Sequence, residues 1–530
     1  MSLTRRSLLR RGGATAAGAG VLGSLAAAST ASAQLGDDRG RGAVVIVLPL
    51  VRASHVNAFE GGAPAKTPNL NDLTKNSLRF DRAIPESMPA VSTRRALVTG
   101  MRAFPFRDWR RLEGFPSVPG FNPVWDHQPL LMEVTRGAGV ETIYVTDNPL
   151  FSGARFPDVR RSSLGEVPTI EPGDPDPPTG IDEELLGSFA RLTRATRATF
   201  REGINALREV KDARSFFVGV DPFDPNDAFH APPFYVRPAR VEDDGLGPTD
   251  GRMNELSFDN DVIDGVREAY VNHVEAVDDE LGKLLDEIPD DTVLFVLGDH
   301  GLALGEHGYL GRAAPTSHRL SYEIPYLIRH PDGEKSGDDV DWYASTHDIA
   351  PTLLSFLGLT IPGKMDGEDL TALFDDVDEE DLPLRAKSIT AVGSQIIIRD
   401  RRWLVIADRQ RIVRRMFDDD EDVEDDIKRY DNIANEDTGK LTELSLASLV
   451  AAGGTLPEFG PDGALRPPMD RADDDTDDDG IPNDMDPFDN DEPDDTVTKK
   501  DLTFDGRYPY GRPVEGGELP SVVREAAKTK

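Results

Sequence analysis

The chain has 530 residues and is long enough to bury a large hydrophobic core. Its 96 acidic residues against 59 Lys and Arg give a formal net charge of -37, which argues against nucleic acid and anionic membrane surfaces as partners. There is no cysteine, so disulfides, thiolate metal sites and a cysteine nucleophile are excluded. A Debye length of roughly 3 Å at 1 M salt would screen this surface charge, so we predict a halophilic protein.

The first 33 residues have the pattern of an export signal. Thr4-Arg5-Arg6-Ser7-Leu8-Leu9 contains a twin arginine, a weakly apolar Ala/Gly run follows, and Ala31-Ser32-Ala33 suits a signal peptidase. A membrane anchor is disfavoured because glycines, among them Gly13, Gly18, Gly20 and Gly23, interrupt the run. We therefore predict a twin-arginine (Tat) signal over residues 1–33, an extracellular or cell-surface location, and no transmembrane segment in the mature protein.

Apolar strands alternate with amphipathic helices over residues 40–380, which predicts an α/β domain. The expected strands are Ala43 to Leu48, Glu141 to Val145, Ser215 to Val220 and Thr292 to Leu297. The expected helices are Asn69 to Asn76, Asp182 to Val210 and Asp259 to Glu287. Ligands of such sheets collect at the carboxyl ends of the strands, where Gly298-Asp299-His300-Gly301 follows the last of these strands.

The C-terminal part has a different pattern. Short strands at Gln395 to Ile398 and Trp403 to Ile406, separated by charged turns, predict a small α+β subdomain with an antiparallel sheet over residues 384–450. Residues 468–495 are dominated by Asp, Pro and Gly and are expected on the surface without a core of their own, and residues 496–530 form a tail.

Within the Asp-rich segment, residues 475–486 have the spacing of a calcium-binding loop, with Gly480 at the turn position. The expected oxygen ligands are Asp475, Asp477, Asp479, Asn483 and Asp486. Neighbouring prolines exclude long flanking helices, so the loop resembles thrombospondin type 3 calcium repeats more than an EF-hand. We predict structural Ca²⁺ with weak affinity, about 10⁻⁴ to 10⁻³ M; the alternative is an acidic linker.

Several segments, in this order, resemble the landmarks of sulfatases, members of the alkaline phosphatase superfamily. They are Thr67-Pro68-Asn69-Leu70, Ser92-Thr93-Arg94 with Leu97-Val98-Thr99-Gly100, Asp224-Pro225-Asn226-Asp227, Asp278-Asp279, Asp299-His300-Gly301, His347-Asp348-Ile349-Ala350-Pro351-Thr352 and Met365-Asp366-Gly367. The resemblance implies a three-layer α/β/α sandwich with a large mixed sheet, followed by the small antiparallel subdomain.

The resemblance also implies metal-assisted ester hydrolysis, in which a divalent cation held by acids polarises the sulfate and a formylglycine attacks sulfur. Several matching positions here hold residues unable to do this. Pro49 and Leu50 stand where the family has paired metal-binding acids, Ala90 stands at the nucleophile position, and Asn226 replaces an expected histidine. The sequence therefore predicts a degenerate active site.

Some candidates for residual chemistry remain. Ser92 or Thr93 beside Arg94 could supply a rearranged nucleophile. Asp299 and His300 could form a partial metal site, or Asp299 could instead accept backbone N–H groups at the strand end.

Arg52, Arg94 and Arg312 could form an anion pocket for sulfated or other anionic small molecules or glycans, or could be solvated or paired arginines. We predict a secreted sulfatase-family protein, by descent a sulfuric-ester hydrolase, with lost or strongly altered catalysis. The alternatives are an active metal-dependent sulfate or phosphate ester hydrolase and a non-catalytic binder of sulfated glycans.

Overall fold

The computed structural model describes residues 42–88, 90–106, 124–148, 150–162, 183–223, 260–304, 310–311, 322–375, 385, 387–392, 395–400, 402–408, 413–418 and 437–452. The chain divides into two units, Met1–Gly36 and Asp37–Lys530. All described residues belong to the second unit. The expected Tat signal, the tail after residue 496 and the acidic loop lie outside the described residues.

The main sheet has eight strands in the order β11-β2-β10-β7-β1-β6-β4-β5. Their bounds are β1 Gly42–Leu48, β2 Leu78–Ile84, β4 Glu141–Thr146, β5 Val159–Arg160, β6 Phe216–Asp221, β7 Thr292–Gly298, β10 Tyr326–Arg329 and β11 Asp339–Ser345. Strands β10 and β7 pair antiparallel, as do β10 and β2, and the other neighbours pair parallel, so the sheet is mixed.

Strand β1 is central because its residues are apolar on both faces. All seven residues are buried, as expected for a strand covered on two sides. It pairs parallel with β6 on one side and β7 on the other. The carboxyl ends of β1, β6 and β7 therefore meet at one edge of the sheet, which we call the carboxyl edge.

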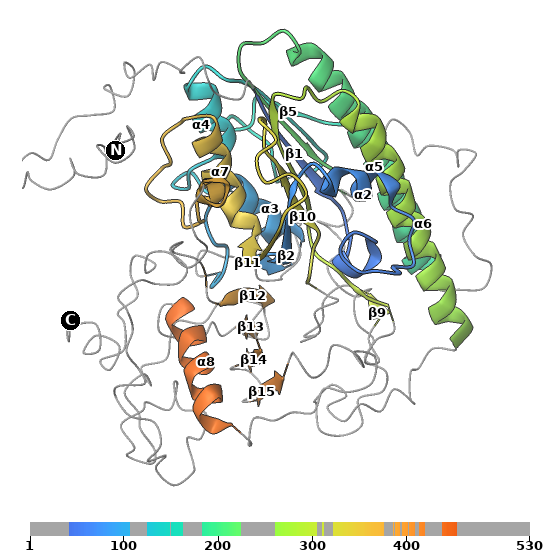
Figure 1. Ribbon diagram of the computed structural model, residues 1–530, viewed down its shortest axis with the longest axis vertical. Helices are drawn as coiled ribbons and strands as arrows, with labels where there is room; N and C mark the ends of the chain where they lie inside the picture. Colours follow the sequence, from blue (N-terminus) through green and yellow to red (C-terminus); the bar gives the residue numbers. More distant parts are fainter. Residues whose placement is uncertain are drawn as a thin grey trace, which may run out of the picture. The chain divides into compact units, whose positions relative to one another are not determined.

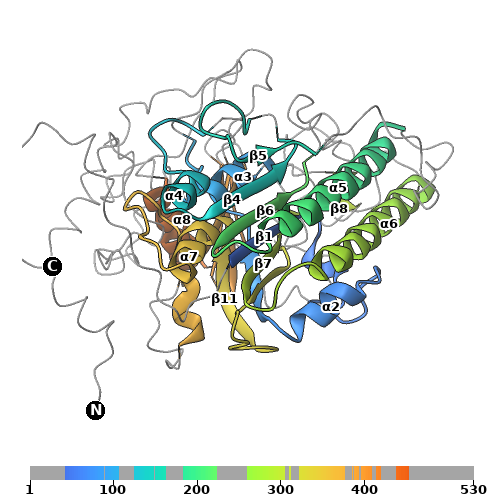
Figure 2. The ribbon, with the colours of Figure 1, turned by 90° about the horizontal axis from the view of Figure 1, so that it is seen from above.

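Helices cover both faces of this sheet (Figure 2). Val44, Ile46 and Leu48 pack in one hydrophobic cluster with α6 Asn260–Leu285, α5 Glu183–Val210 and α2 Pro68–Thr74. The alternate residues Ala43, Val45 and Val47 pack in a second cluster with α3 Ala90–Thr99, α4 Leu131–Gly137 and α7 Ile349–Phe356. The period of two in β1 thus divides its side chains between two helical layers.

A second, five-stranded sheet has the order β15-β14-β13-β12-β3, and helix α8 Thr438–Ala451 packs against β13 and β14 (Figure 1). The strands are β3 Ser87–Met88, β12 Ser388–Val392, β13 Gln395–Arg399, β14 Trp403–Asp408 and β15 Val413–Asp418. Strand β3 leads directly into α3, so this sheet is tied to the segment that carries Arg94.

The expected α/β class, the large mixed sheet and the smaller second sheet are confirmed, and each strand and helix expected from apolar patterning is present. Shorter elements complete the described part of the chain: the 3-10 helices η1 Ala53–His55, η6 Thr346–Asp348 and η7 Leu370–Phe374, and a two-stranded ribbon of β8 Ala303–Leu304 and β9 Leu310–Gly311. Among the described residues, none of the helices has the length and apolar character needed to cross a bilayer.

Candidate functional site

The candidate site lies at the carboxyl edge. Asp221 is the last residue of β6, Asp299 directly follows β7, and the turn at Pro49 and Leu50 directly follows β1. Helix α3 brings Arg94 to the same place, one turn after Ala90. Three strands and one helix, distant in sequence, thus place their terminal groups together.

The Arg94 guanidinium is the centre of this arrangement. Its Nε donates to Asp221 Oδ1 at 2.7 Å and its Nη1 donates to Asp299 Oδ2 at 2.8 Å. The same group donates to the carbonyls of Ala90 at 3.2 Å and Pro222 at 3.0 Å. We call these four oxygen acceptors the Arg94 cage. The ring of Phe223 lies 5.1 Å from the guanidinium carbon, in cation–π range.

The two carboxylates of the cage have further partners. Asp299 Oδ1 accepts the backbone N–H groups of Leu50 at 2.6 Å and His300 at 2.7 Å. Asp221 Oδ2 accepts the hydroxyl of Tyr144 at 3.2 Å. Each oxygen of both carboxylates therefore already has a donor from the chain.

Burial dominates the electrostatics, since the side chains of Arg94, Asp221 and Asp299 are 1%, 0% and 3% exposed. Burial raises the pKa of Asp221 above its ordinary value, and the charge of Arg94 only partly offsets this. For Asp299, burial also acts upward, but the neighbouring His300 and Arg94 and the hydrogen bonds lower its pKa below the ordinary value. Arg94 is held protonated, because the two carboxylates more than offset the effect of burial on its pKa.

The turn after β1 is fixed by helix α6. His273 Nε2 donates to the Pro49 carbonyl at 2.9 Å, and its Nδ1 lies 2.9 Å from the Thr193 hydroxyl. Tyr270 donates its hydroxyl to the Leu50 carbonyl at 2.6 Å. Leu50 has a left-handed backbone with φ 57° and a buried side chain. The turn is thus held by protein hydrogen bonds and directs a leucine into the core.

Ala90, Ser92 and Thr93 are all buried in α3. Ala90 begins the helix and presents its carbonyl to Arg94, and its methyl group has no nucleophilic atom. The Thr93 hydroxyl donates to the Ser87 carbonyl at 2.6 Å, so it serves the junction between β3 and α3. Ser92 is 0% exposed and does not present its hydroxyl to solvent.

A divalent cation, as the resemblance implies, requires several oxygen ligands with available lone pairs. Pro49 and Leu50 offer no side-chain oxygen at this edge, and Asp221 and Asp299 already bind the Arg94 cation. Throughout the described part of the chain, no group of three or more His, Asp and Glu side chains has a metal-binding arrangement. The described residues of the carboxyl edge therefore do not fit a divalent cation.

The other sequence-predicted residues divide into two groups. His300 is buried, with its Nδ1 2.7 Å from the Gly301 carbonyl, and Arg52 is buried and donates to the Leu302 carbonyl at 3.0 Å and to Ser54. Arg312, Asn226 and the proposed calcium ligands lie outside the described residues. The structure thus brings Arg94 and Asp299 together and gives Arg52 contacts of its own.

Sequence reasoning missed Asp221, Tyr144, Tyr270 and His273. Asp221 had a signal, because it directly follows a buried apolar run and parallel strands present such residues at the carboxyl edge. The other three lie within a strand and a helix whose patterns indicated core positions. No local sequence feature distinguishes them from packing residues.

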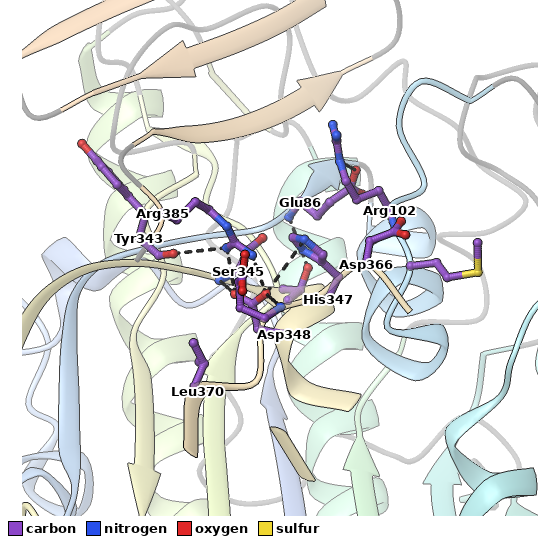
Figure 3. A network of polar contacts seen from close by, with 12 residues as sticks. Glu86, Arg102, Tyr343, Ser345, His347, Asp348, Asp366, Leu370 and Arg385 are labelled. Atoms are coloured by element: carbon purple, nitrogen blue, oxygen red, sulfur yellow. Dashed lines mark hydrogen bonds and ion pairs between the residues drawn. The ribbon is translucent and has the colours of Figure 1, made fainter. Parts of the chain in front are cut away.

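A second buried polar cluster lies where η6 meets the chain leading to β12 (Figure 3). Asp348 accepts two hydrogen bonds from Arg385, at 2.6 and 2.8 Å, and further ones from the backbone N–H groups of Ser345 and Glu368. His347 is buried beside this pair, and burial lowers its pKa to about 3. This cluster, like the cage, neutralises a buried acid with an arginine and ties the region before β12 to the main sheet.

A family model described as Sulfatase matches residues 42–359, more than half of the chain. Together with the fold, this match places the chain in the sulfatase family. The matched range contains the whole Arg94 cage.

Relatives extend this finding. The chain is 23% identical over 396 residues to the multifunctional alkaline phosphatase superfamily protein PehA of Trinickia caryophylli, covering 60% of this chain and 73% of that protein. Its fold is similar to the phosphonate monoester hydrolase of Agrobacterium radiobacter, with TM-score 0.56 and 19% identity over 81% of this chain and 100% of the other. It is also similar to a 2-O GAG sulfatase, with TM-score 0.57 and 14% identity over 78% and 92% of the two chains.

Proposed function

We propose that this chain is an exported, halophilic member of the sulfatase family that does not hydrolyse sulfate esters by the usual mechanism. The observation that carries the proposal is the Arg94 cage. Arg94 forms ion pairs with both buried carboxylates of the carboxyl edge, which a catalytic metal would otherwise need as ligands. The methyl group of Ala90 at the matching nucleophile position and the lack of any cysteine support the same conclusion. On this proposal the chain descends from a sulfuric-ester hydrolase and has kept its fold but not its activity, because a fold does not by itself determine function.

A rearranged hydrolase is the less supported alternative. Its nucleophile would be Ser92 or Thr93, and both are buried, with the Thr93 hydroxyl donating to the Ser87 carbonyl. A nucleophile needs a base within hydrogen-bond reach and access to the substrate. The burial of these two hydroxyls therefore favours a structural role.

The test is hydrolysis of p-nitrophenyl sulfate and p-nitrophenyl phosphate at high salt, with calcium, magnesium or manganese added in turn. We expect no turnover above the buffer rate for the wild type. Turnover that Asp299→Ala, Ser92→Ala or Thr93→Ala removes, in a variant that keeps its melting temperature, would refute the proposal and support a rearranged site.

A role as a binder of sulfated glycans is favoured by one comparison, the similarity of the fold to a 2-O GAG sulfatase. Arg52 and Arg94 contribute little to an anion pocket here, since both guanidinium groups already donate to oxygens of the chain. Binding that depends on Arg312 remains as the second proposal. It predicts affinity for a sulfated polysaccharide that falls with rising salt and is weakened by Arg312→Ala.

We further propose that the loop of residues 475–486 binds structural calcium. The spacing of its oxygen ligands carries this proposal. Calcium should raise the melting temperature of the wild type and have no effect on a variant with Asp475→Asn, Asp477→Asn and Asp479→Asn. An equal calcium response in both proteins would remove the proposal.

A further inference from the structure

The Arg94 cage has the chemistry of a cation site built from protein oxygens. Two acceptors are carboxylate oxygens and two are backbone carbonyls, at 2.7 to 3.2 Å from guanidinium nitrogens. They come from the end of β6, the start of α3 and the end of β7, so they converge from three separate elements. Hard oxygen donors of these two kinds are those that calcium prefers in proteins.

The surroundings hold the two carboxylates of this cage in place without any added ion. Asp299 is fixed through its other oxygen by two backbone N–H groups, and Asp221 is fixed by Tyr144. The turn after β1 is held by Tyr270 and His273 from α6. The two carboxylates therefore have supports that do not depend on Arg94 itself.

We propose that Arg94 is a built-in cation that replaces a bound divalent metal at the carboxyl edge. The wild-type protein consequently takes no divalent ion between Asp221 and Asp299, since a second cation there would be repelled by a guanidinium that already donates four hydrogen bonds to the cage. Removal of the guanidinium converts the cage into a divalent-cation site. Its ligands are the two carboxylates and the carbonyls of Ala90 and Pro222, with water completing the coordination.

The inference concerns cation binding and not turnover, so it can fail independently of the proposed function. Its test begins with a background protein that carries Asp475→Asn, Asp477→Asn and Asp479→Asn, which removes the candidate calcium loop. Calcium and manganese are titrated calorimetrically at one high sodium chloride concentration, which weakens ion binding to the acidic surface. In this background, we expect that Asp299→Asn changes neither the number of bound ions nor the shift in melting temperature that calcium produces.

Arg94→Ala in the same background should gain one bound calcium and a calcium-dependent rise in melting temperature. Both gains should disappear when Asp299→Asn is added. Arg208→Ala is the matched control, because Arg208 is an exposed arginine paired with Glu287, and its removal should create no site. Arg94→Lys retains a cation in the cage and should also gain no site.

Two results would overturn the inference. One is a calcium or manganese ion bound by the background protein and lost on Asp299→Asn, since the metal and Arg94 would then coexist. The other is a folded Arg94→Ala protein that gains no ion. If Arg94→Ala does not fold, even in calcium, two other measurements still decide whether the cage binds a divalent ion. They are the comparison of the background protein with and without Asp299→Asn, and the titration of Arg94→Lys, and both use proteins that keep a cation in the cage.

Discussion

Replacing Arg94 by Met should destabilise the protein strongly, because it removes the counter-ion of two buried carboxylates and leaves an apolar side chain that replaces only the aliphatic part of the arginine. Both carboxylates are at most 3% exposed, so solvent screens little of their charge. Breaking a buried ion pair on one side costs about 3 to 5 kcal/mol. We expect a loss of unfolding free energy of this size, measured by urea denaturation at constant high salt in a metal chelator.

Two companion variants make this prediction specific. Adding Asp221→Asn to Arg94→Met removes one of the two unbalanced charges and should recover part of the loss. Arg208→Met, at an exposed arginine, should change stability by less than about 0.5 kcal/mol. A loss of less than about 1 kcal/mol for Arg94→Met would show that the carboxylates do not depend on Arg94, and the reasoning would be wrong.

Three further predictions test the framework around the site. His347 has a pKa of about 3 in the folded protein against an ordinary value of about 6.5, so the folded state keeps the imidazole neutral where the unfolded state protonates it. The free energy of unfolding is therefore highest above pH 6.5 and falls as the pH is lowered towards 3. The wild type should therefore lose about 2 kcal/mol relative to His347→Gln between pH 7.5 and pH 5 in denaturation experiments, and parallel profiles would contradict this. Asp278 accepts the N–H groups of Asn69 and Leu70 at the start of α2, so Asp278→Ala should cost about 1 to 2 kcal/mol, whereas the exposed neighbour Asp279→Ala should not. A Cβ at Gly298 would lie 2.7 Å from the Val51 carbonyl oxygen, so Gly298→Ala should cost about 1 to 3 kcal/mol; an unchanged melting temperature would show that β7 and the turn after β1 are less tightly packed than described.

Much of the fold was predictable because its central elements have strong periodic signals. The run at β1 and the run at β7 are apolar on both faces, which is typical of buried parallel strands. The long helices α5 and α6 each have an apolar stripe that packs on the sheet. The antiparallel insertion of β10 between β7 and β2 was not predictable, because a strand of four residues contains no information about its neighbours.

The sequence predicted which side chains at the candidate site are unsuited to the family's chemistry, but it did not predict the ion pairs of Arg94. The resemblance places Pro49, Leu50 and Ala90 at the ligand and nucleophile positions, and the sequence shows directly that their side chains have no oxygen or nucleophilic atom. The two partners of Arg94 could not be predicted from the sequence. Asp221 and Asp299 lie 127 and 205 residues away, and only the order of the strands in the sheet brings them next to Arg94. The alternative in which Asp299 accepts backbone N–H groups agrees with its contacts to Leu50 and His300.

The most direct test of the central claim is a crystal structure of the protein grown with manganese, with anomalous scattering recorded at the manganese absorption edge. Manganese suits carboxylate and carbonyl ligands and is located unambiguously by its anomalous signal. The account predicts no peak between Asp221 and Asp299, with the Arg94 guanidinium hydrogen-bonded to both. A manganese peak at that position, with Arg94 displaced, would contradict it.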